Sequence, residues 1–302
     1  MGESMFDVII VGAGPAGLSA ALVLGRCGRR VLVCDAGQPR NAASHALHGF
    51  LTRDGVGPAE FLELAREQLA PYETVELRKT EVTDAVSLPA HFDLTLSNGQ
   101  HIFSRKLLLA TGVGDELPEL AGFAEFYGRS VFHCPYCDGW ELRDQPLAVY
   151  GYGENGSGLA LELTLWSRDL VLCTDGPSQL SSEQLDRLAK NDIGVRESKI
   201  VRLEGDDGLL ERIVFADGEP LARRGMFFST GQKQGSVLPK KLGCEFTEDG
   251  CVATGDYETT NVPGLYVAGD ASRLVQFVVV AASEGAQAAV AINKELLKED
   301  LD

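Results

Sequence analysis

The stretch that decides the fold is Phe6–Gly17, which reads FDVIIVGAGPAG. Its first six residues form a short, mostly apolar run, as expected of a parallel strand buried on both faces. The glycines that follow allow a tight turn, a close backbone approach to a pyrophosphate, and contact between strand and helix. A helix-like run to about Cys27 and a second apolar strand ending on Asp35 complete the unit. The stretch therefore predicts a dinucleotide site in which Asp35 accepts hydrogen bonds from a ribose.

The second half of the chain repeats this pattern. The apolar run Pro146–Tyr150 leads into GYGENG, then into a helix-like stretch and a strand that ends at Cys173. The candidate nicotinamide contacts are Gly151, Gly153 and Gly156. A 2′-phosphate requires a cation after the second strand, whereas this loop carries Asp175 and no nearby lysine or arginine. The sequence thus disfavours NADPH, and it leaves open both NADH and a domain that keeps the fold without a nicotinamide.

Together the two units predict an α/β protein with two Rossmann-like dinucleotide-binding domains. Short alternating segments follow each unit, at 75–109 and 193–228, and the first of these predicts a β-meander. Each domain is therefore expected to have three layers of the β/β/α type. Helices are predicted over Pro58–Leu69 and Arg273–Leu297, and the small residues in the latter predict close helix packing.

Directly ahead of the second unit the chain reads HCPYCDGW, His133–Trp140. Two cysteines separated by two residues can close a small disulfide ring, and their neighbours commonly make one thiol acidic enough to attack at neutral pH. Half of a zinc site is the alternative, but a second ligand pair at matching spacing is absent from the sequence. The pattern favours a redox dithiol, with Cys134, Cys137 and Asp138 as candidate catalytic residues and Asp138 as the proton donor or acceptor.

A loop rich in small residues follows Asp35 and contains His45 and His48. In parallel sheets ligands bind beyond the carboxyl ends of the strands, so these histidines could approach a cofactor. They could equally be solvated loop residues, and the sequence leaves both interpretations open.

At 302 residues the chain is long enough for two domains. Its net charge of -17 argues against a nucleic acid or an anionic membrane as partner. No apolar run approaches the roughly 20 residues that span a bilayer. The N-terminus shows neither a basic region nor an apolar core of an export signal, and the number of cysteines is odd, so a cytoplasmic protein is expected.

From end to end the chain resembles the low-molecular-weight thioredoxin reductases. The motifs that carry this resemblance are GAGPAG at 12–17, ATG at 110–112, CPYCDG at 134–139 and AGD at 268–270. The resemblance implies an FAD-binding domain of residues 1–114 and 244–302, interrupted by a nicotinamide-type domain of residues 115–243 that carries the redox pair. The implied cofactor contacts are Gly12, Gly14, Ala16, Gly17, Asp35, Asn41, His48, Thr111, Gly112, Gly269, Asp270 and Gln276.

The resemblance further implies an FAD-dependent thiol–disulfide oxidoreductase. Two electrons pass between the flavin and the Cys134/Cys137 pair, Asp138 moves the proton, and a thioredoxin-like protein or a small disulfide is the substrate. A homodimer is also implied.

Two features depart from that family. The arginine cluster that binds NADPH is missing after Cys173, which leaves NADPH, NADH or a protein electron donor such as a ferredoxin open. In addition, the stretch Arg40–Gly49 resembles the dithiol oxidases of gliotoxin and holomycin biosynthesis, which pass electrons from a small dithiol to oxygen. An oxygen-dependent dithiol oxidase that forms a disulfide in a small molecule or peptide is therefore the alternative function.

Overall fold

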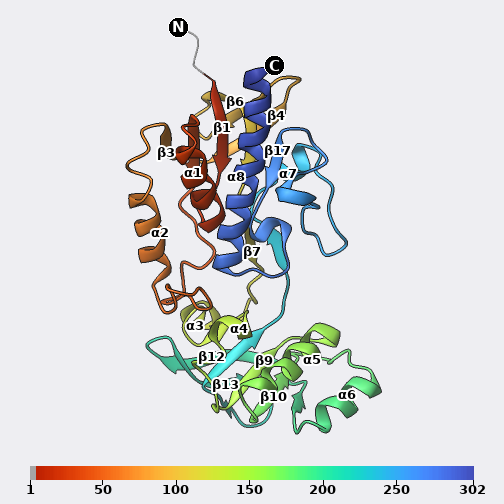
Figure 1. Ribbon diagram of the computed structural model, residues 1–302. Helices are drawn as coiled ribbons and strands as arrows, with labels where there is room; N and C mark the ends of the chain where they lie inside the picture. The colour runs from red at the N-terminus through yellow and green to blue at the C-terminus, as the bar shows by residue number, and fades with distance from the viewer. Residues whose placement is uncertain (1–4) are drawn as a thin grey trace. The chain divides into compact units, whose positions relative to one another are not determined.

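A computed structural model describes residues 5–302; the first four residues, on which the expected lack of an export signal partly depends, lie outside that range. The chain divides into two compact units (Figure 1). Unit 1 comprises the N-terminal part up to Ala42, then Gly49–Gly114 and Gln232–Asp302. Unit 2 comprises Ala43–His48 and Asp115–Gly231. The second unit is thus inserted in the first.

The chain re-enters unit 1 at Gln232, earlier than the predicted boundary at residue 244. The physical reason is packing. Helix α7 (Leu238–Lys241) buries Leu238 in the hydrophobic core of unit 1, and Leu242 just beyond it joins the same core. The segment 232–243 therefore folds with unit 1.

Unit 1 is built on a seven-stranded sheet in the order β3-β2-β1-β6-β5-β4, with β17 also paired to β6. The strands are β1 (Phe6–Val11), β2 (Val31–Asp35), β3 (Val75–Lys79), β4 (Val82–Ser87), β5 (Phe92–Leu96), β6 (His101–Leu109) and β17 (Leu265–Val267). Strands β1, β2, β3, β6 and β17 pair in parallel, whereas β4, β5 and β6 form an antiparallel meander. The predicted meander therefore begins at β4, because β3 joins the parallel part of the sheet beside β2.

Both faces of the parallel strands are covered. Val8 and Ile10 of β1 pack under the helices α1 (Pro15–Arg26) and α8 (Val278–Leu301), while Ile9 and Val11 pack toward the meander. Alternate residues of a strand point to opposite faces, so a strand covered on both sides is apolar throughout. Unit 1 thus has the expected three layers, and α1 and α8 lie side by side on the sheet (Figure 1). A further helix, α2 (Pro58–Glu67), also belongs to this unit.

Helix α8 begins at Val278, five residues later than predicted. Arg273 and Phe277, the N-cap of α8, have extended backbone with ψ 149°, so the helix begins only after them. The expected close packing of the small residues is confirmed. A Cβ on Gly285 would lie 1.9 Å from the carbonyl oxygen of Ala16, so the backbones of α8 and α1 are in direct contact.

Unit 2 repeats the design. Its five-stranded sheet has the order β11-β10-β9-β15-β8, with all strands parallel, and a separate antiparallel sheet has the order β12-β13-β14. The strands are β8 (Val131–Phe132), β9 (Leu147–Tyr150), β10 (Leu170–Cys173), β11 (Gly194–Arg196), β12 (Ile200–Asp206), β13 (Leu209–Phe215), β14 (Leu221–Ala222) and β15 (Gly225–Phe228). Strands β9, β10, β11 and β15 stand in the same order as β1, β2, β3 and β6, which confirms the two Rossmann-like units.

Short elements complete the chain. The helices of unit 2 are α3 (Phe123–Phe126), α4 (Pro135–Asp138), α5 (Gly153–Glu162) and α6 (Ser182–Ala189). The remaining elements are the paired strands β7 (Val113–Asp115) and β16 (Gln232–Gln234) and the 3₁₀ turns η1 (Leu163–Leu165), η2 (Asp256–Glu258) and η3 (Asp270–Ser272). Within residues 5–302, no helix is both long enough and apolar enough to cross a membrane.

Candidate functional site

In the glycine turn of unit 1, two glycines pack tightly against the backbone and a third borders open space. Gly12 adopts φ +107°, and a Cβ there would lie 2.2 Å from the carbonyl oxygen of Ala110. A Cβ on Gly17 would lie 1.9 Å from the carbonyl oxygen of Gly12, so neither position admits a side chain. At Gly14, the N-cap of α1, a Cβ would meet no atom of the described chain within 4 Å. An open helix N-terminus with a glycine at its cap is suited to a phosphate.

Polar groups surround this turn. Asp35 at the end of β2 accepts the backbone N–H of Gly37 at 2.9 Å and pairs with Arg66 of α2 at 3.1 Å, while a quarter of its side chain stays accessible. After β6, the hydroxyl of Thr111 is buried without a hydrogen-bond partner among residues 5–302. Gly112 beside it adopts φ +60° with open space around it. A fixed carboxylate and an unpaired buried hydroxyl next to an open turn fit a bound dinucleotide.

The end of β17 carries a further polar cluster. Gly269 adopts φ +86°, and Asp270 follows it. The guanidinium of Arg40 pairs with the Asp270 carboxylate at 2.9 Å and donates to the side-chain oxygen of Gln276 at 2.6 Å. Gln276 in turn donates to Gln232 at 2.9 Å. The structure thus brings Asp270 and Gln276 together through Arg40, which was not among the predicted site residues.

Of the predicted cofactor contacts, all except His48 lie in unit 1. Ala16 is buried in the first turn of α1, and Asn41 follows Arg40. The role of each residue in binding a cofactor stays a prediction. The segment Ala43–His48 belongs to unit 2, so His48 lies among the groups that surround the cysteine pair.

The cysteine pair occupies the one-turn helix α4. Cys134 is its N-cap and Pro135 its first residue, and a disulfide joins Cys134 to Cys137 with their Cα atoms 5.3 Å apart. Gly139 follows the turn, and a Cβ there would lie 2.5 Å from the carbonyl oxygen of Pro135 and 2.8 Å from the ring of Trp166, so the position admits no side chain. Both cysteines are half-buried. The spacing seen in the sequence therefore yields a disulfide that remains partly accessible.

An acid with a shifted pKa stands beside this disulfide. Burial raises the pKa of Asp138 to about 7; the charge of His48 opposes the shift and that of Glu141 adds to it. His48 Nε2 lies 3.6 Å from a carboxylate oxygen of Glu141. A carboxyl group with a pKa near neutrality can both donate and accept a proton. Glu141 was missed in the sequence, although its spacing of three residues from Asp138 places it one helical turn away.

Exposed aromatic side chains flank the pair. Tyr136 and Trp140 are 58% and 63% exposed. The ring centres of Tyr136 and Trp166 lie 5.5 Å apart in a T-shaped arrangement. The guanidinium of Arg143 lies 4.3 Å from the ring centre of Trp140. Large aromatic side chains left in solvent beside a reactive group favour contact with a substrate.

The glycine turn of unit 2 keeps the packing of its counterpart, but one of its amides is bonded within the chain. A Cβ on Gly156 would lie 2.6 Å from the carbonyl carbon of Gly151, so the close packing of the two ends is retained. The backbone N–H of Gly153, however, donates to the carbonyl oxygen of Ser178 at 2.8 Å. The N–H of Ser178 donates to the carboxylate of Glu197, also at 2.8 Å. The loop after β10 therefore engages one backbone amide at the N-terminus of α5, the kind of helix end that can face a phosphate.

Asp175 helps to hold this loop. It adopts φ +54°, its carboxylate accepts the backbone N–H of Ile200 at 2.6 Å, and it pairs with Lys199 at 2.6 Å. The sequence interpretation places Asp175 opposite a ribose or a 2′-phosphate. In the structure its carboxylate is largely buried and bonded within the chain. The structure thus gives Asp175 a structural role in the loop.

Two Rossmann-like units, one with an open dinucleotide turn and the other with a cysteine pair beside an acid, define the class of nucleotide-linked disulfide oxidoreductases. Residues 6–285 match the pyridine nucleotide-disulphide oxidoreductase family, and the chain belongs to it. The thioredoxin reductase tcpT of Claviceps purpurea is 31% identical, over 98% of this chain and 96% of that protein. Among solved structures, a putative thioredoxin reductase TrxB from Bacillus anthracis matches with a TM-score of 0.92 at 34% identity, covering 98% of this chain and 99% of that one. HlmI matches with a TM-score of 0.94 at 37% identity, covering 99% and 95%.

The chain is therefore a flavin-dependent disulfide oxidoreductase of the thioredoxin reductase-like type, and its cofactor is FAD. The residues of unit 1 fit this cofactor. The open N-terminus of α1 at Gly14 would hold the pyrophosphate, the Asp35 carboxylate a ribose, and the unpaired Thr111 hydroxyl a further polar group.

Proposed function

We propose that the Cys134–Cys137 pair is the redox centre through which this flavoenzyme exchanges two electrons with a disulfide or dithiol substrate. The observation that carries the proposal is the disulfide across α4, followed directly by an acid whose pKa is raised to about 7. FAD, when bound in unit 1, supplies the carrier of the electron pair between the cysteines and the second redox partner.

Thiol–disulfide exchange accounts for the chemistry at the pair. In the reducing direction, one thiolate of the pair attacks a substrate sulfur, which forms a mixed disulfide and releases the other substrate sulfur. The second cysteine then attacks the sulfur of the first cysteine in this mixed disulfide. The bond to the substrate breaks, the Cys134–Cys137 bond closes, and the second substrate thiol is released. The two protons lost by the cysteines end on the two product thiols. Asp138 is placed to carry one of them, because its pKa is near neutrality.

We propose a thioredoxin-like protein or a small disulfide as the substrate. The thioredoxin reductases among the similar proteins support the former, and the exposed Tyr136 and Trp140 offer contact surface for either. We further propose a homodimer that works in the cytoplasm. Exposed apolar side chains of unit 1, at Leu51, Leu274 and Val275, support association with a second copy. The five free cysteines support a reducing compartment.

The bonded amide of Gly153 in unit 2 favours a second candidate function. If the bond from Gly153 to Ser178 excludes a nicotinamide, electrons enter from a dithiol or from a protein donor such as a ferredoxin. In the first case the enzyme is an oxygen-dependent dithiol oxidase. A small dithiol loses two electrons and two protons through the cysteine pair to form a disulfide, and dioxygen takes them up as hydrogen peroxide. The residues keep the same roles in reverse.

A trapping experiment tests the redox role of the pair. Cys134→Ser and Cys137→Ser are each incubated with substrate disulfide under mild reducing conditions, and mixed disulfides are detected by intact-protein mass spectrometry. One of the two variants is expected to accumulate the adduct, which identifies the attacking sulfur. Cys27→Ser, at an exposed free cysteine, is the control and is expected to turn over normally. Undiminished turnover by both active-site variants would refute the proposal.

A further inference from the structure

Glu284 connects three segments of unit 1. It lies in the second turn of α8 and is 4% exposed. One carboxylate oxygen accepts the backbone N–H of Gly269 at 2.7 Å, and the other pairs with Nε of Arg273 at 2.5 Å. Gly269 itself packs against α1, since a Cβ there would lie 3.1 Å from the Cβ of Ala16. The carboxylate thus joins α8 to the segment after β17, and Gly269 in turn contacts the first turn of α1.

The position of this carboxylate is fixed by the backbone beside it. The next residue, Gly285, contacts the backbone of Ala16 so closely that no side chain fits between them. Helix α8 therefore cannot slide along α1 without a clash. The backbone of Glu284 is therefore held in place, and its buried side chain accepts the N–H of Gly269 directly.

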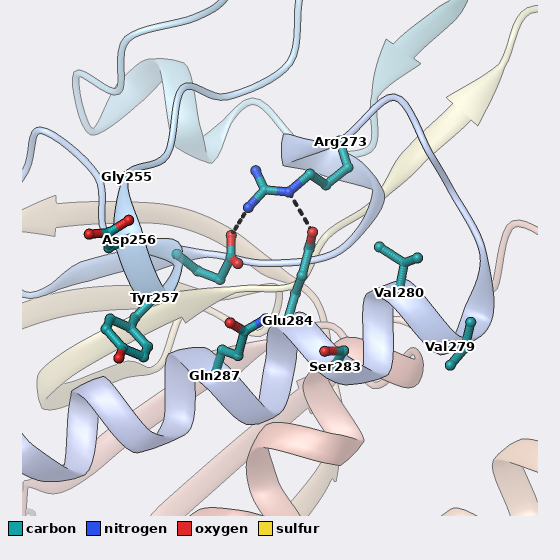
Figure 2. A pocket seen from close by; sticks show the side chains of 10 residues that line it. Gly255, Asp256, Tyr257, Arg273, Val279, Val280, Ser283, Glu284 and Gln287 are labelled. Atoms are coloured by element: carbon teal, nitrogen blue, oxygen red, sulfur yellow. Dashed lines mark hydrogen bonds and ion pairs between the residues drawn. The ribbon is translucent and has the colours of Figure 1, made fainter.

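A second buried acid completes the network. Arg273 also pairs with Glu258 at 2.6 Å, so two buried carboxylates share one guanidinium (Figure 2). Glu258 adopts φ +64° and its neighbour Tyr257 φ +56°, a backbone conformation that is unfavourable for residues other than glycine. Buried ion pairs contribute little net stability. The network is therefore better explained by the geometry that it imposes than by its contribution to folding.

What the network holds is the turn before Asp270. The hydrogen bond from Gly269 to Glu284 lies one peptide unit from Asp270, whose carboxylate points to Arg40 in the cluster predicted to contact the cofactor. We propose that Glu284 is a positioning residue for FAD. Its carboxylate fixes the left-handed Gly269 so that Asp270 is presented to the cofactor. This inference rests on the cofactor site proposed for unit 1, and it does not depend on the redox role of the cysteines.

A cavity of about 450 Å³ adjoins the network on its outer side, so solvent can reach Arg273. Gln287 lines the same cavity three residues further along α8 and is exposed (Figure 2). It shares the helix and the cavity with Glu284, but within residues 5–302 the amide of Gly269 bonds to Glu284 and not to Gln287. Gln287→Ala is therefore a matched control for Glu284→Ala.

The test measures FAD binding directly. Apoprotein of the wild type, Glu284→Ala, Glu284→Gln and Gln287→Ala is titrated with FAD, and binding is followed by flavin fluorescence and by visible circular dichroism. Without this bond FAD must re-order the turn on binding, and because a hydrogen bond to a charged group contributes about 1.5–3 kcal/mol, Glu284→Ala should weaken FAD binding by roughly tenfold and at most about a hundredfold. Glu284→Gln keeps an acceptor for Gly269 but places an amide against Arg273, so its loss should be smaller, roughly threefold to tenfold. Gln287→Ala should bind as the wild type does.

Thermal unfolding of the apoproteins separates positioning from general destabilisation. A Glu284→Ala variant that unfolds at lower temperature but binds FAD with wild-type affinity and dichroism would refute the proposal. If that variant does not fold, Glu284→Gln decides alone, and wild-type affinity together with a wild-type flavin spectrum would refute it. A Cys134→Ser/Cys137→Ser variant should titrate like the wild type, so failure of the redox proposal would leave this result unchanged.

Discussion

The glycine turns of the two units share one backbone design and differ in what lies in front of them. In both, the last glycine packs against the first, at Gly17 in unit 1 and Gly156 in unit 2. In unit 1 the middle residue, Gly14, faces open space. In unit 2 the N–H of Gly153 is bonded to the carbonyl of Ser178. The fingerprint thus determines how strand and helix meet, but not whether a phosphate can bind between them.

The loop after the second strand makes the difference. After β2, Asp35 bonds to the N–H of Gly37, and the turn before α1 stays open. After β10, Asp175, Gly176 and Gln179 all have positive φ, and this backbone brings the Ser178 carbonyl to the Gly153 amide. A loop of a few residues can therefore engage an amide of the glycine turn while the order of the sheet strands stays the same.

The largest expected effect comes from filling the open turn of unit 1. Gly14→Val has room for its side chain in the protein and an ordinary φ of -76°, so the apoprotein should fold with nearly wild-type stability. The side chain would stand where the pyrophosphate binds, and FAD affinity should fall by more than about a thousandfold, or 4 kcal/mol. The measurements are flavin content after purification and FAD titration of the apoprotein.

The matched change in unit 2 is Gly153→Ala. Its φ of +58° should cost about 1 kcal/mol of stability, but the flavin content should stay that of the wild type. Loss of flavin from Gly153→Ala, or wild-type flavin content in Gly14→Val, would contradict the assignment of the FAD site to the glycine turn of unit 1.

The second prediction concerns what unit 2 contributes in place of a nucleotide. Replacing either active-site cysteine, in Cys134→Ser or Cys137→Ser, should lower turnover by roughly a thousandfold or more, because exchange needs both sulfurs. The flavin content should not change, since the FAD contacts are assigned to unit 1. Turnover is measured with a dithiol or disulfide substrate. Activity that persists in both variants would mean that electrons bypass unit 2.

The third prediction follows from the pKa of Asp138, which burial raises to about 7. Asp138→Asn should slow thiol–disulfide exchange by roughly a hundredfold and remove an inflection near pH 7 from its pH profile. Glu141→Gln removes a charge that raises this pKa, so the inflection should move to lower pH. His48→Asn removes a charge that lowers it, so the inflection should move to higher pH. Stopped-flow measurements between pH 5 and pH 9 test all three, and an inflection that survives in Asp138→Asn would assign it to another group.

The same pKa makes a prediction about stability. The folded-state value lies above the ordinary value of 3.8, so the native carboxyl binds its proton more tightly than the unfolded one. Stability contributed by this proton is present below pH 4 and is lost as pH rises toward about 7. Asp138→Asn carries no charge there, and its unfolding temperature should exceed that of the wild type at pH 8 but not at pH 4. Equal shifts at both pH values would contradict the assignment.

The smallest effect is expected from loosening the closed turn of unit 2. Asp175→Asn tolerates the positive φ of this position and frees the ammonium of Lys199, which could then meet a 2′-phosphate. Combined with Glu197→Gln, which weakens the bond to Ser178, it should raise NADPH affinity a few-fold, because one weak ion pair contributes about 1 kcal/mol or less. Equilibrium dialysis against NADPH and NADH measures the change, and Lys190→Gln serves as a control at an exposed lysine of the same unit. Unchanged nucleotide affinity would show that more than this loop closes the site.

Local patterns predicted the elements that depend on nearby residues. The run of β1, the glycine turn and α1 could be read from the sequence because strand burial and helix–strand contact leave a direct mark on residue types. The cysteine pair could also be predicted, because two cysteines separated by two residues can close a disulfide ring without help from distant residues. The order of strands confirmed the repeat that the second glycine motif had indicated.

Features that depend on distant partners could not be read in this way. Strand β3 was assigned to the meander because its pairing with β2 has no local signal. The predicted start of α8 is too early. Arg273 forms ion pairs with Glu258 of η2 and Glu284 of α8, and partners this distant leave no signal in the local sequence. The hydrogen bond between Gly153 and Ser178 depends on positive φ angles at Asp175 and Gln179. Neither residue is a glycine, so the sequence does not predict this conformation.

The central claim is that the Cys134–Cys137 pair exchanges two electrons with an FAD that is bound in unit 1. The most direct measurement mixes the anaerobic holoprotein with NADPH, with NADH and with a small dithiol, and follows the visible absorbance of the flavin. Bleaching by the dithiol is expected in the wild type and not in Cys137→Ser, and the two nicotinamides show in the same experiment whether unit 2 accepts either of them as donor. No bleaching by the dithiol in the wild type, or equal bleaching in Cys137→Ser, would contradict the claim, because electrons would then bypass the cysteine pair.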